Sequence, residues 1–530
     1  MACSKLFSGD LPHELLNEVI QNFHYDYKTL HSCILVNRLW CRLAIPLLWE
    51  DPFSKDYPKN YQFIEIYFSK LNEDDKTKFN EYGIKFDLLH SNTLFNYPSF
   101  IKYLDTNKIR HSIENWAVGA TTTSRLQVSD FTKLIFRLLF VKFIENEVNL
   151  HSFKVRPCAC FNEILGLIQQ NPKFICNITN FKLDWSNSFD DIREILRILC
   201  SNCYSISSLY FFPFLEYAKN EKSLSQLIKS QKNLQKILFS YNHEYTLYHP
   251  LLSLQNSNCS NTLNTIIFYL VDFKNIVVLS EVFNQLNVLE SIHIVYCYSM
   301  YSNFIHQINN ITKPFKLKTL FLNEIIYESL ELLLQKSGNY LENLNFRYTK
   351  PRQFQKLLRL FIKYCSNISN IKYIDSICVY SQNNCYLLLL NLIKNITQKL
   401  NYLTITVSNS ILLKNLGQIL PFKLEYLDLS LLSDLVNASD LEIFLKKSQN
   451  TFIKKLLIST DLGRKDDDIL PYIEEHIMKT KRVKYLALEV CREDLFFQTD
   501  KVKEFALHNI CVFKYNDLKF DIINFLEEIH

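Results

Sequence analysis

The chain has 530 residues, of which 48% are hydrophobic and 14% aromatic, and this composition excludes a largely disordered protein. Its 59 basic and 54 acidic side chains give a formal net charge of +5, so nucleic-acid binding by a basic surface is not indicated. No stretch approaches the ~18 uninterrupted apolar residues of a membrane span, and the first residues contain no apolar signal core. With 15 scattered cysteines, we expect a cytoplasmic or nuclear protein with reduced thiols.

Three short amphipathic helices are predicted in the first fifty residues. Apolar side chains recur at helical spacing over residues 15–23, 30–36 and 40–47. Pro12 suits a first helical position, because the N–H that proline lacks would have no intrahelical partner there. Three apolar faces in so short a module cannot be buried well by the module alone. We therefore expect this segment to pack on a partner, either within the chain or outside it.

The order and spacing of these residues resemble the F-box. The elements that carry the resemblance are Leu11-Pro12, Glu14-Leu15-Leu16, Ile20, Val36-Asn37-Arg38-Leu39-Trp40, Leu43-Ala44 and Leu48-Trp49. An F-box at residues 8–52 implies docking on the Skp-type adaptor of a cullin–RING ubiquitin ligase. The side chains that the resemblance places toward the adaptor are Leu11, Pro12, Leu15, Ile20, Val36 and Trp40. The alternative is a helical cap that only closes the first repeat of the following domain.

One apolar phrase recurs along the rest of the chain, after a predicted helical connector and N-terminal cap at residues 53–112. It consists of an apolar residue, two spacers, an apolar residue, one spacer and an apolar residue. It is clearest at residues 317–322, 341–346, 400–405, 424–429 and 483–488. Its first positions run from Ile113 to about Leu507, mostly at intervals of about 24 to 30 residues. This period predicts a solenoid over residues 113–512, with a C-terminal cap at 513–530.

Helices are predicted between the phrases. Apolar residues recur at helical spacing at residues 191–199, 276–286, 328–335, 354–364, 387–396 and 440–447. A strand and a helix within thirty residues resemble the leucine-rich repeat, so we expect an α/β horseshoe of about thirteen to fifteen repeats. The position where that family favours Asn or Cys holds Cys158, Asn242, Cys297 and Cys491, but also Val271, Ile325 and Leu432. The subtype of the repeat is therefore left open.

Two columns of spacer residues are predicted to face the inner curve of the sheet. From residue 343 onward they read Asn343, Tyr373, Tyr402, Tyr426, Lys455, Tyr485, and Asn345, Asp375, Thr404, Asp428, Leu457, Ala487. Parallel strands lie about 4.8 Å apart, so the tyrosines would stack as a ladder of a kind favoured at binding surfaces. The substrate-binding residues predicted on this basis are Tyr373, Asp375, Tyr402, Tyr426, Asp428 and Tyr485. The alternative is that these aromatic side chains only pack on one another.

No motif for catalysis, for a metal or for a cofactor is found. Cys200 and Cys203 form one CxxC without a second pair, and Asp466–Asp468 are best explained as a solvated loop. We therefore expect a non-enzymatic substrate receptor of a Skp–cullin–F-box ubiquitin ligase. Its F-box would bind the adaptor and, through it, the cullin, while the inner face would bind an unknown protein. The alternative is a leucine-rich-repeat scaffold or inhibitor without a ligase role.

Overall fold

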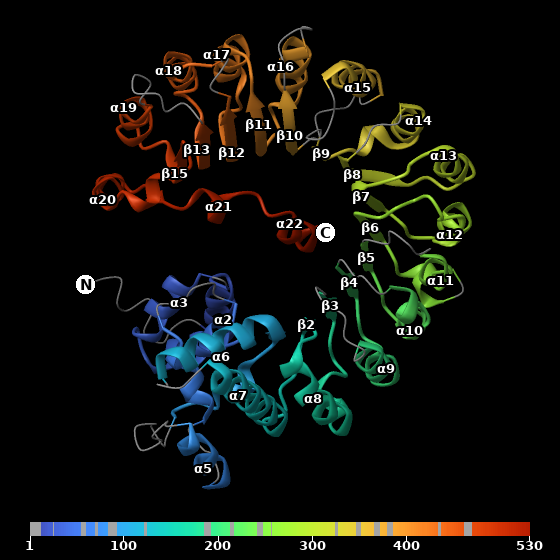
Figure 1. Ribbon diagram of the computed structural model, residues 1–530, viewed down its shortest axis with the longest axis vertical. Coiled ribbons are helices and arrows are strands. Elements are labelled where there is room, and N and C mark those ends of the chain that lie inside the picture. Colours follow the sequence, from blue (N-terminus) through green and yellow to red (C-terminus); the bar gives the residue numbers. More distant parts are fainter. Residues whose placement is uncertain are drawn as a thin grey trace. The chain divides into compact units, whose positions relative to one another are not determined.

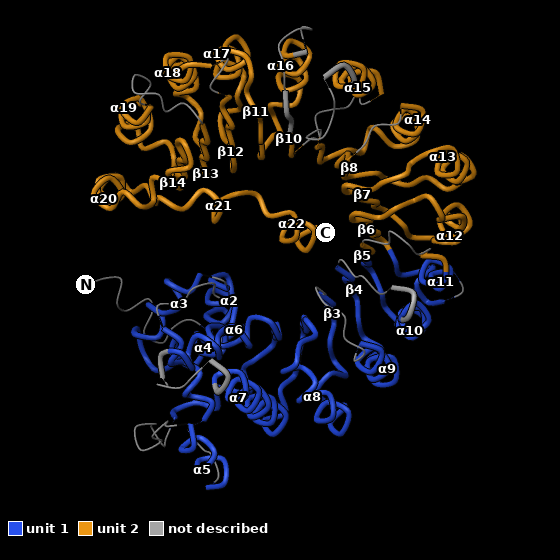
Figure 2. Tube along the Cα trace, viewed as in Figure 1, with its two compact units in different colours: residues 1–237, 249–263 blue, residues 238–248, 264–530 orange. Residues whose placement is uncertain are grey.

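Two compact units make up the chain in this computed structural model. Unit 1 comprises residues 1–237 and 249–263, and unit 2 comprises residues 238–248 and 264–530 (Figure 2). The residues that the structure describes are 12–24, 26–54, 60–68, 73–82, 93–120, 125–184, 192–212, 217–240, 247–255, 257–323, 327–345, 351–364, 372–378, 385–432, 436–460 and 469–529.

Unit 1 begins with the three predicted helices, α2 (His13–Gln21), α3 (Tyr27–Ile34) and α4 (Arg38–Leu48). Side chains cap two of them: Asp26 accepts a hydrogen bond from the Thr29 amide at 3.1 Å, and Asn37 accepts one from the Trp40 amide at 2.9 Å. Such caps satisfy amides that have no intrahelical partner. The buried core of this N-terminal module consists of Leu16, Ile20, Leu30, Cys33, Ala44 and Leu47.

The rest of unit 1 alternates helices with short parallel strands. The helices and 3₁₀ turns are at Gln62–Phe68, α5 (Glu73–Glu81), Tyr97–Phe100, α6 (Thr106–Ala120), α7 (Arg125–Glu145), α8 (Ala159–Gln170), Pro172–Phe174, α9 (Ile192–Asn202), α10 (Tyr217–Ser230), α11 (Tyr248–Leu252) and Asn258–Asn261. The strands are β1 (Tyr103–Asp105), β2 (Ser152–Val155), β3 (Asn180–Leu183), β4 (Ser208–Phe211) and β5 (Lys236–Ser240). The unit boundary falls within β5. The prediction that a repeat phrase starts at Ile113 is wrong, because this residue is buried in α6.

Unit 2 repeats the alternation of strand and helix. Its parallel strands are β6 (Thr265–Tyr269), β7 (Ser291–Cys297), β8 (Lys316–Leu322), β9 (Asn343–Asn345), β10 (Tyr373–Cys378), β11 (Tyr402–Val407), β12 (Lys423–Leu431), β13 (Phe452–Thr460) and β14 (Val483–Val490). The helices between them are α12 (Leu279–Gln285), α13 (Ser302–Asn309), α14 (Tyr327–Ser337), α15 (Pro351–Tyr364), α16 (Cys385–Ile396), α17 (Ser410–Ile419), α18 (Ala438–Lys447) and α19 (Leu470–Ile473). The helices lie on one side of the strands (Figure 1). We call the opposite side the inner face.

The second apolar residue of each phrase builds the core of unit 2. Leu344, Ile374, Leu403, Leu427, Leu456 and Leu486 are direct neighbours in the strand register and are all completely buried. Burying one such side chain stabilises the fold by about 1.5–3 kcal/mol. This ladder explains why the phrase repeats, and it confirms the predicted fold class, a helical module followed by a parallel-sheet α/β solenoid.

The C-terminal residues follow a different course from the repeats. After β14 come β15 (Glu493–Asp494), α20 (Thr499–Leu507), β16 (Cys511–Val512), α21 (Tyr515–Leu518) and α22 (Ile522–Glu528). Strand β16 pairs with β14. From there, α21 and α22 run along the inner face of unit 2 (Figure 1). We call residues 513–529 the C-terminal strap. Among the described helices, none is long and apolar enough to cross a membrane.

Candidate functional site

The N-terminal module exposes several large apolar side chains. Those of α2 and of the segment from α3 into α4 are Leu15 (46% exposed), Val19 (41%), Leu35 (78%), Val36 (53%) and Leu39 (36%). Leu15 and Val19 are four residues apart and therefore share one face of α2. Apolar side chains exposed in groups, rather than singly, are typical of surfaces that bind another protein.

The six predicted adaptor-facing residues have different environments. Pro12 precedes α2 and is exposed, as are Leu15 and Val36. Ile20 is completely buried in the core of the module, and Trp40 is partly buried against the same core. These two residues therefore help to hold the helices together, and we leave both out of the surface proposed below. Leu11 lies outside the described residues.

Three exposed apolar residues of this surface were not among those predicted from the sequence, namely Val19, Leu35 and Leu39. For Val19 the signal was present, because it lies one helical turn after Leu15. Leu35 follows α3, and Leu39 is the second residue of α4. At such helix ends, helical spacing does not indicate which side chains the core covers.

Glu50 attaches the module to the first strand of unit 1. Its buried carboxylate contacts His24 Nε2 at 2.8 Å and Lys102 Nζ at 2.5 Å. Its carbonyl oxygen accepts hydrogen bonds from the amides of Lys102 and Tyr103. The helices are therefore held against β1 rather than joined to it by a loose linker.

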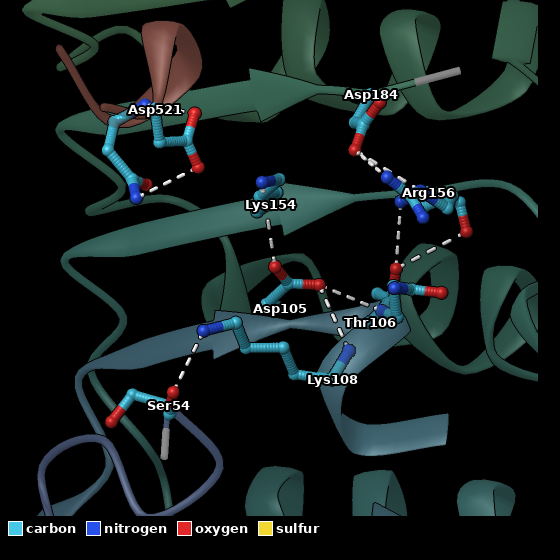
Figure 3. A network of polar contacts seen from close by, with 10 residues as sticks. Ser54, Asp105, Thr106, Lys108, Lys154, Arg156, Asp184 and Asp521 are labelled. Atoms are coloured by element: carbon cyan, nitrogen blue, oxygen red, sulfur yellow. Dashed lines mark hydrogen bonds and ion pairs between the residues drawn. The ribbon is translucent and has the colours of Figure 1, made fainter. Parts of the chain in front are cut away.

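A polar network continues this attachment across β1, β2 and β3 (Figure 3). Lys108 Nζ donates to the Ser54 carbonyl at 2.8 Å, and Lys154 lies 3.8 Å from the Asp105 carboxylate. Arg156 forms an ion pair with Asp184. The contacts join the segment after α4 to α6 and connect β1, β2 and β3, so the network has a structural role in fixing the start of the sheet.

The tyrosine ladder is present on the inner face of unit 2. Tyr373 pairs in register with Tyr402, which pairs with Tyr426, as the phrase predicts. The ring centroids are 6.4 Å apart for the first pair and 6.1 Å for the second. Lys455 and Tyr485 continue the column. The predicted register is therefore confirmed, while the role of these residues in substrate binding stays a prediction.

Two buried carboxylates lie beside the ladder. Asp375 accepts a hydrogen bond from Asn345 Nδ2 at 2.7 Å. Asp428 accepts one from the Tyr515 hydroxyl at 2.7 Å and a longer one, 3.4 Å, from Tyr426. Burial raises the pKa of the Tyr373, Tyr426 and Tyr515 phenols, and the nearby aspartates raise these pKa values further. The three phenols are consequently neutral and able to donate at physiological pH.

The C-terminal strap covers much of this ladder. Tyr402 is 38% exposed, whereas its neighbours Tyr373 and Tyr426 are both 2% exposed. The Phe520 ring packs on Tyr373 at 4.6 Å, and the Phe520 amide donates to the Tyr426 hydroxyl at 2.9 Å. Tyr485 packs partly against the same cluster, in which Tyr515 and Leu518 are buried. The strap thus occupies the face that the sequence assigns to a substrate.

A cavity of about 340 Å³ remains between the strap and the inner face. Its lining consists of Tyr269, Leu270, Tyr296, Tyr298, Asn323, Tyr373, Asp375, Thr404, Asp428, Lys519, Phe520 and Ile522. Aromatic rings and two carboxylates therefore surround a space large enough for a side chain. Among the described residues, no group of three His, Cys, Asp or Glu side chains could hold a metal ion.

Comparisons with known proteins find similarity at the level of structure. No protein-family model matches the chain, and no curated protein matches it. The chain is similar to a solved structure described as the crystal structure of the Rad7 and Elc1 complex in yeast. The two chains are 13% identical with a TM-score of 0.43, and the match covers 75% of this chain and 94% of that chain. At this level of identity, the similarity assigns no function.

Proposed function

We propose that the chain is a non-catalytic substrate receptor of a ubiquitin ligase, working in the cytoplasm or nucleus. The helices α2 to α4 dock on a Skp-type adaptor and, through it, on a cullin, while the inner face of unit 2 holds a protein substrate. The observation that carries this proposal is the group of exposed apolar residues on the N-terminal module: Leu15, Val19, Leu35, Val36 and Leu39.

These side chains favour a docking module over a cap. A cap that closes the first repeat would bury its apolar residues on that repeat. Here the module buries one set of residues in its own core and leaves a second set in solvent. Covering the second set would gain about 25 cal/mol per Å² of apolar surface removed from water. An adaptor with an apolar helical surface would supply that cover, in agreement with the F-box resemblance of the same residues.

A second candidate function is a solenoid scaffold or inhibitor without a ligase role. The inner face alone would serve such a function, and the tyrosine ladder and cavity suit it equally well. This alternative gives no role to the exposed residues of the N-terminal module, and adaptor binding distinguishes the two functions.

The test is binding of a purified Skp-type adaptor to two full-length variants. We expect Leu15→Asp/Val36→Asp to lower the affinity more than tenfold, at least about 1.4 kcal/mol, because a charge would enter each half of the apolar surface. Both side chains are about half exposed, so the fold should tolerate the change. Leu507→Asp, on an α20 side chain that is 82% exposed, is the matched control and should bind normally. Equal binding by both variants and the wild type would exclude this surface as the docking site.

A further inference from the structure

We propose that the inner face of β8–β13 is a peptide-binding surface and that the C-terminal strap is its resident ligand. A partner segment of the same chemistry displaces the strap. The inference deepens the proposed function, since it names the kind of substrate segment that this face would accept. It does not depend on adaptor binding, so the two proposals can fail separately.

Three aromatic side chains anchor the strap, and they are evenly spaced. Tyr515 donates its hydroxyl to Asp428, with an oxygen–oxygen distance of 2.7 Å. The Phe520 ring packs at a tilt on Tyr373, and the Phe525 ring stacks on Phe321 with the centroids 5.5 Å apart. The intervals are five residues each. The surface therefore recognises an aromatic residue at every fifth position, the first of which carries a hydroxyl.

Few backbone hydrogen bonds join the strap to the rest of unit 2. The amides of Phe513, Tyr515 and Phe520 donate to the Leu486 carbonyl, the Asp494 carboxylate and the Tyr426 hydroxyl, respectively. Beyond β16, the described residues of the strap form the short helices α21 and α22 and pair with no strand. Release of the strap would therefore leave the hydrogen bonds between the sheet strands intact. Segments held by a few such contacts open at a lower free energy than the sheet beneath them.

Part of the surface under the strap is organised by contacts that do not involve the strap. The rings of the ladder tyrosines pack on one another from neighbouring strands, and Asp375 has its own donor in Asn345. The cavity of about 340 Å³ beside Phe520 extends the same surface. An incoming segment can therefore find aromatic stacking partners, a carboxylate acceptor and space for an additional side chain.

The first experiment measures binding of a fluorescent synthetic peptide of residues 511–529 to full-length protein by polarisation. The wild type should bind it weakly, because the tethered strap is present at an effective concentration in the millimolar range. The strap variant Tyr515→Phe/Phe520→Ala/Phe525→Ala should bind it at least tenfold more tightly. A peptide carrying the Tyr515→Phe change should bind that variant about tenfold more weakly, since it lacks the hydrogen bond to a carboxylate.

Phe422→Ala serves as the matched control, because this phenylalanine is 82% exposed and precedes β12. Its peptide affinity should equal that of the wild type. If the strap variant unfolds cooperatively like the wild type and yet binds no peptide, the inner face is not a peptide-binding surface. Equal binding by wild type, control and strap variant would place the peptide elsewhere and would also overturn the proposal.

A second measurement needs no variant and covers the case in which the strap variant does not fold. Amide hydrogen exchange of the wild type should show residues 515–529 exchanging at least tenfold faster than β12–β14. This result is expected because the strap opens while the sheet stays paired. Exchange of the strap and these strands in one cooperative step would show that the strap is an integral part of the core, and the proposal would be wrong.

Discussion

Arg482 is a charge that the fold buries without a carboxylate partner among its described contacts. Its guanidinium donates to the carbonyls of Leu445 and His476 and to Ser448, and the residue is 6% exposed. Burial lowers its pKa to about 10, so the side chain stays charged at neutral pH. It satisfies carbonyl groups near the end of α18 that have no intrahelical partner.

Arg482→Met should therefore destabilise the protein, because three buried carbonyl groups would each lose their charged donor and keep only one neutral donor. We expect the free energy of unfolding to fall by about 2–4 kcal/mol, measured by urea denaturation. Lys503→Met is the control, since the Lys503 side chain is 78% exposed and should shift this energy by less than about 0.5 kcal/mol. Equal stabilities of the two variants would contradict a structural role for the guanidinium.

We expect Asp51 to make the stability of the protein dependent on pH. Burial raises its pKa from 3.8 to about 7, while Lys108 lowers it and Asp105 raises it further. A carboxyl group whose pKa is higher in the folded than in the unfolded state stabilises the fold fully at pH values below its unfolded pKa. That stability is lost as the pH rises from about 4 to about 7. Asp51→Asn should be as stable as the wild type near pH 4 and more stable by about 1–4 kcal/mol at pH 8.

Thermal or urea unfolding of wild type and Asp51→Asn at several pH values checks this expectation. Asp500→Asn is the control, because its side chain is 97% exposed, and its difference from the wild type should not change with pH. A difference between Asp51→Asn and wild type that is constant from pH 4 to pH 8 would show that Asp51 is not desolvated in the folded protein.

Helix α18 shows how a repeat is fixed at the level of one element. Asn437 accepts a hydrogen bond from the Asp440 amide at 2.9 Å, and Asp440 accepts one from the Asn437 amide at 3.1 Å. Asp440 also contacts Lys414 and Ser410 of α17, at 2.7 and 2.8 Å. The Asp440 carboxylate therefore caps the N-terminus of α18 and also attaches this helix to α17 of the previous repeat.

Replacing the two members of this capping box should have unequal effects. We expect Asn437→Ala to lower the free energy of unfolding by about 1 kcal/mol, as for the loss of one helix cap. Asp440→Ala should lower it by about 2–3 kcal/mol, because the buried contacts to α17 are lost as well. Lys447→Ala, on the exposed side of α18, should have little effect. Similar losses for both variants would show that the contacts to α17 do not contribute.

Much of the solenoid could be predicted from the sequence, because each buried position recurs with the same neighbours. The phrase placed Leu403 between Ile374 and Leu427, and the strand register agrees. A single match to the repeat phrase is less informative. Ile113 fits the phrase but belongs to α6, because a helix also has apolar residues three and four positions apart. A period is reliable only where it is sustained over several repeats.

The candidate sites were less predictable, since they depend on contacts between residues distant in sequence. The Tyr515 hydroxyl meets Asp428 across 87 residues, and nothing in the repeat pattern brings the C-terminal strap onto the ladder. Likewise, the amphipathic pattern of α2 marks both Leu15 and Ile20 as apolar but does not show that the core covers only Ile20. Tertiary packing, not local spacing, decides which apolar residues stay available to a partner.

At the scale of the whole molecule, the proposed ligase role requires that the N-terminal module bind an adaptor. The most direct measurement is a calorimetric titration of the wild-type, full-length protein with a purified Skp-type adaptor at several temperatures. We predict saturable one-to-one binding with a negative heat-capacity change, because apolar surface on α2 and at the start of α4 would leave water. No binding by a cooperatively folded protein at about 100 μM adaptor, where even a weak complex would form, would contradict the proposed ligase role. The chain would then be a solenoid that binds partners through its inner face alone.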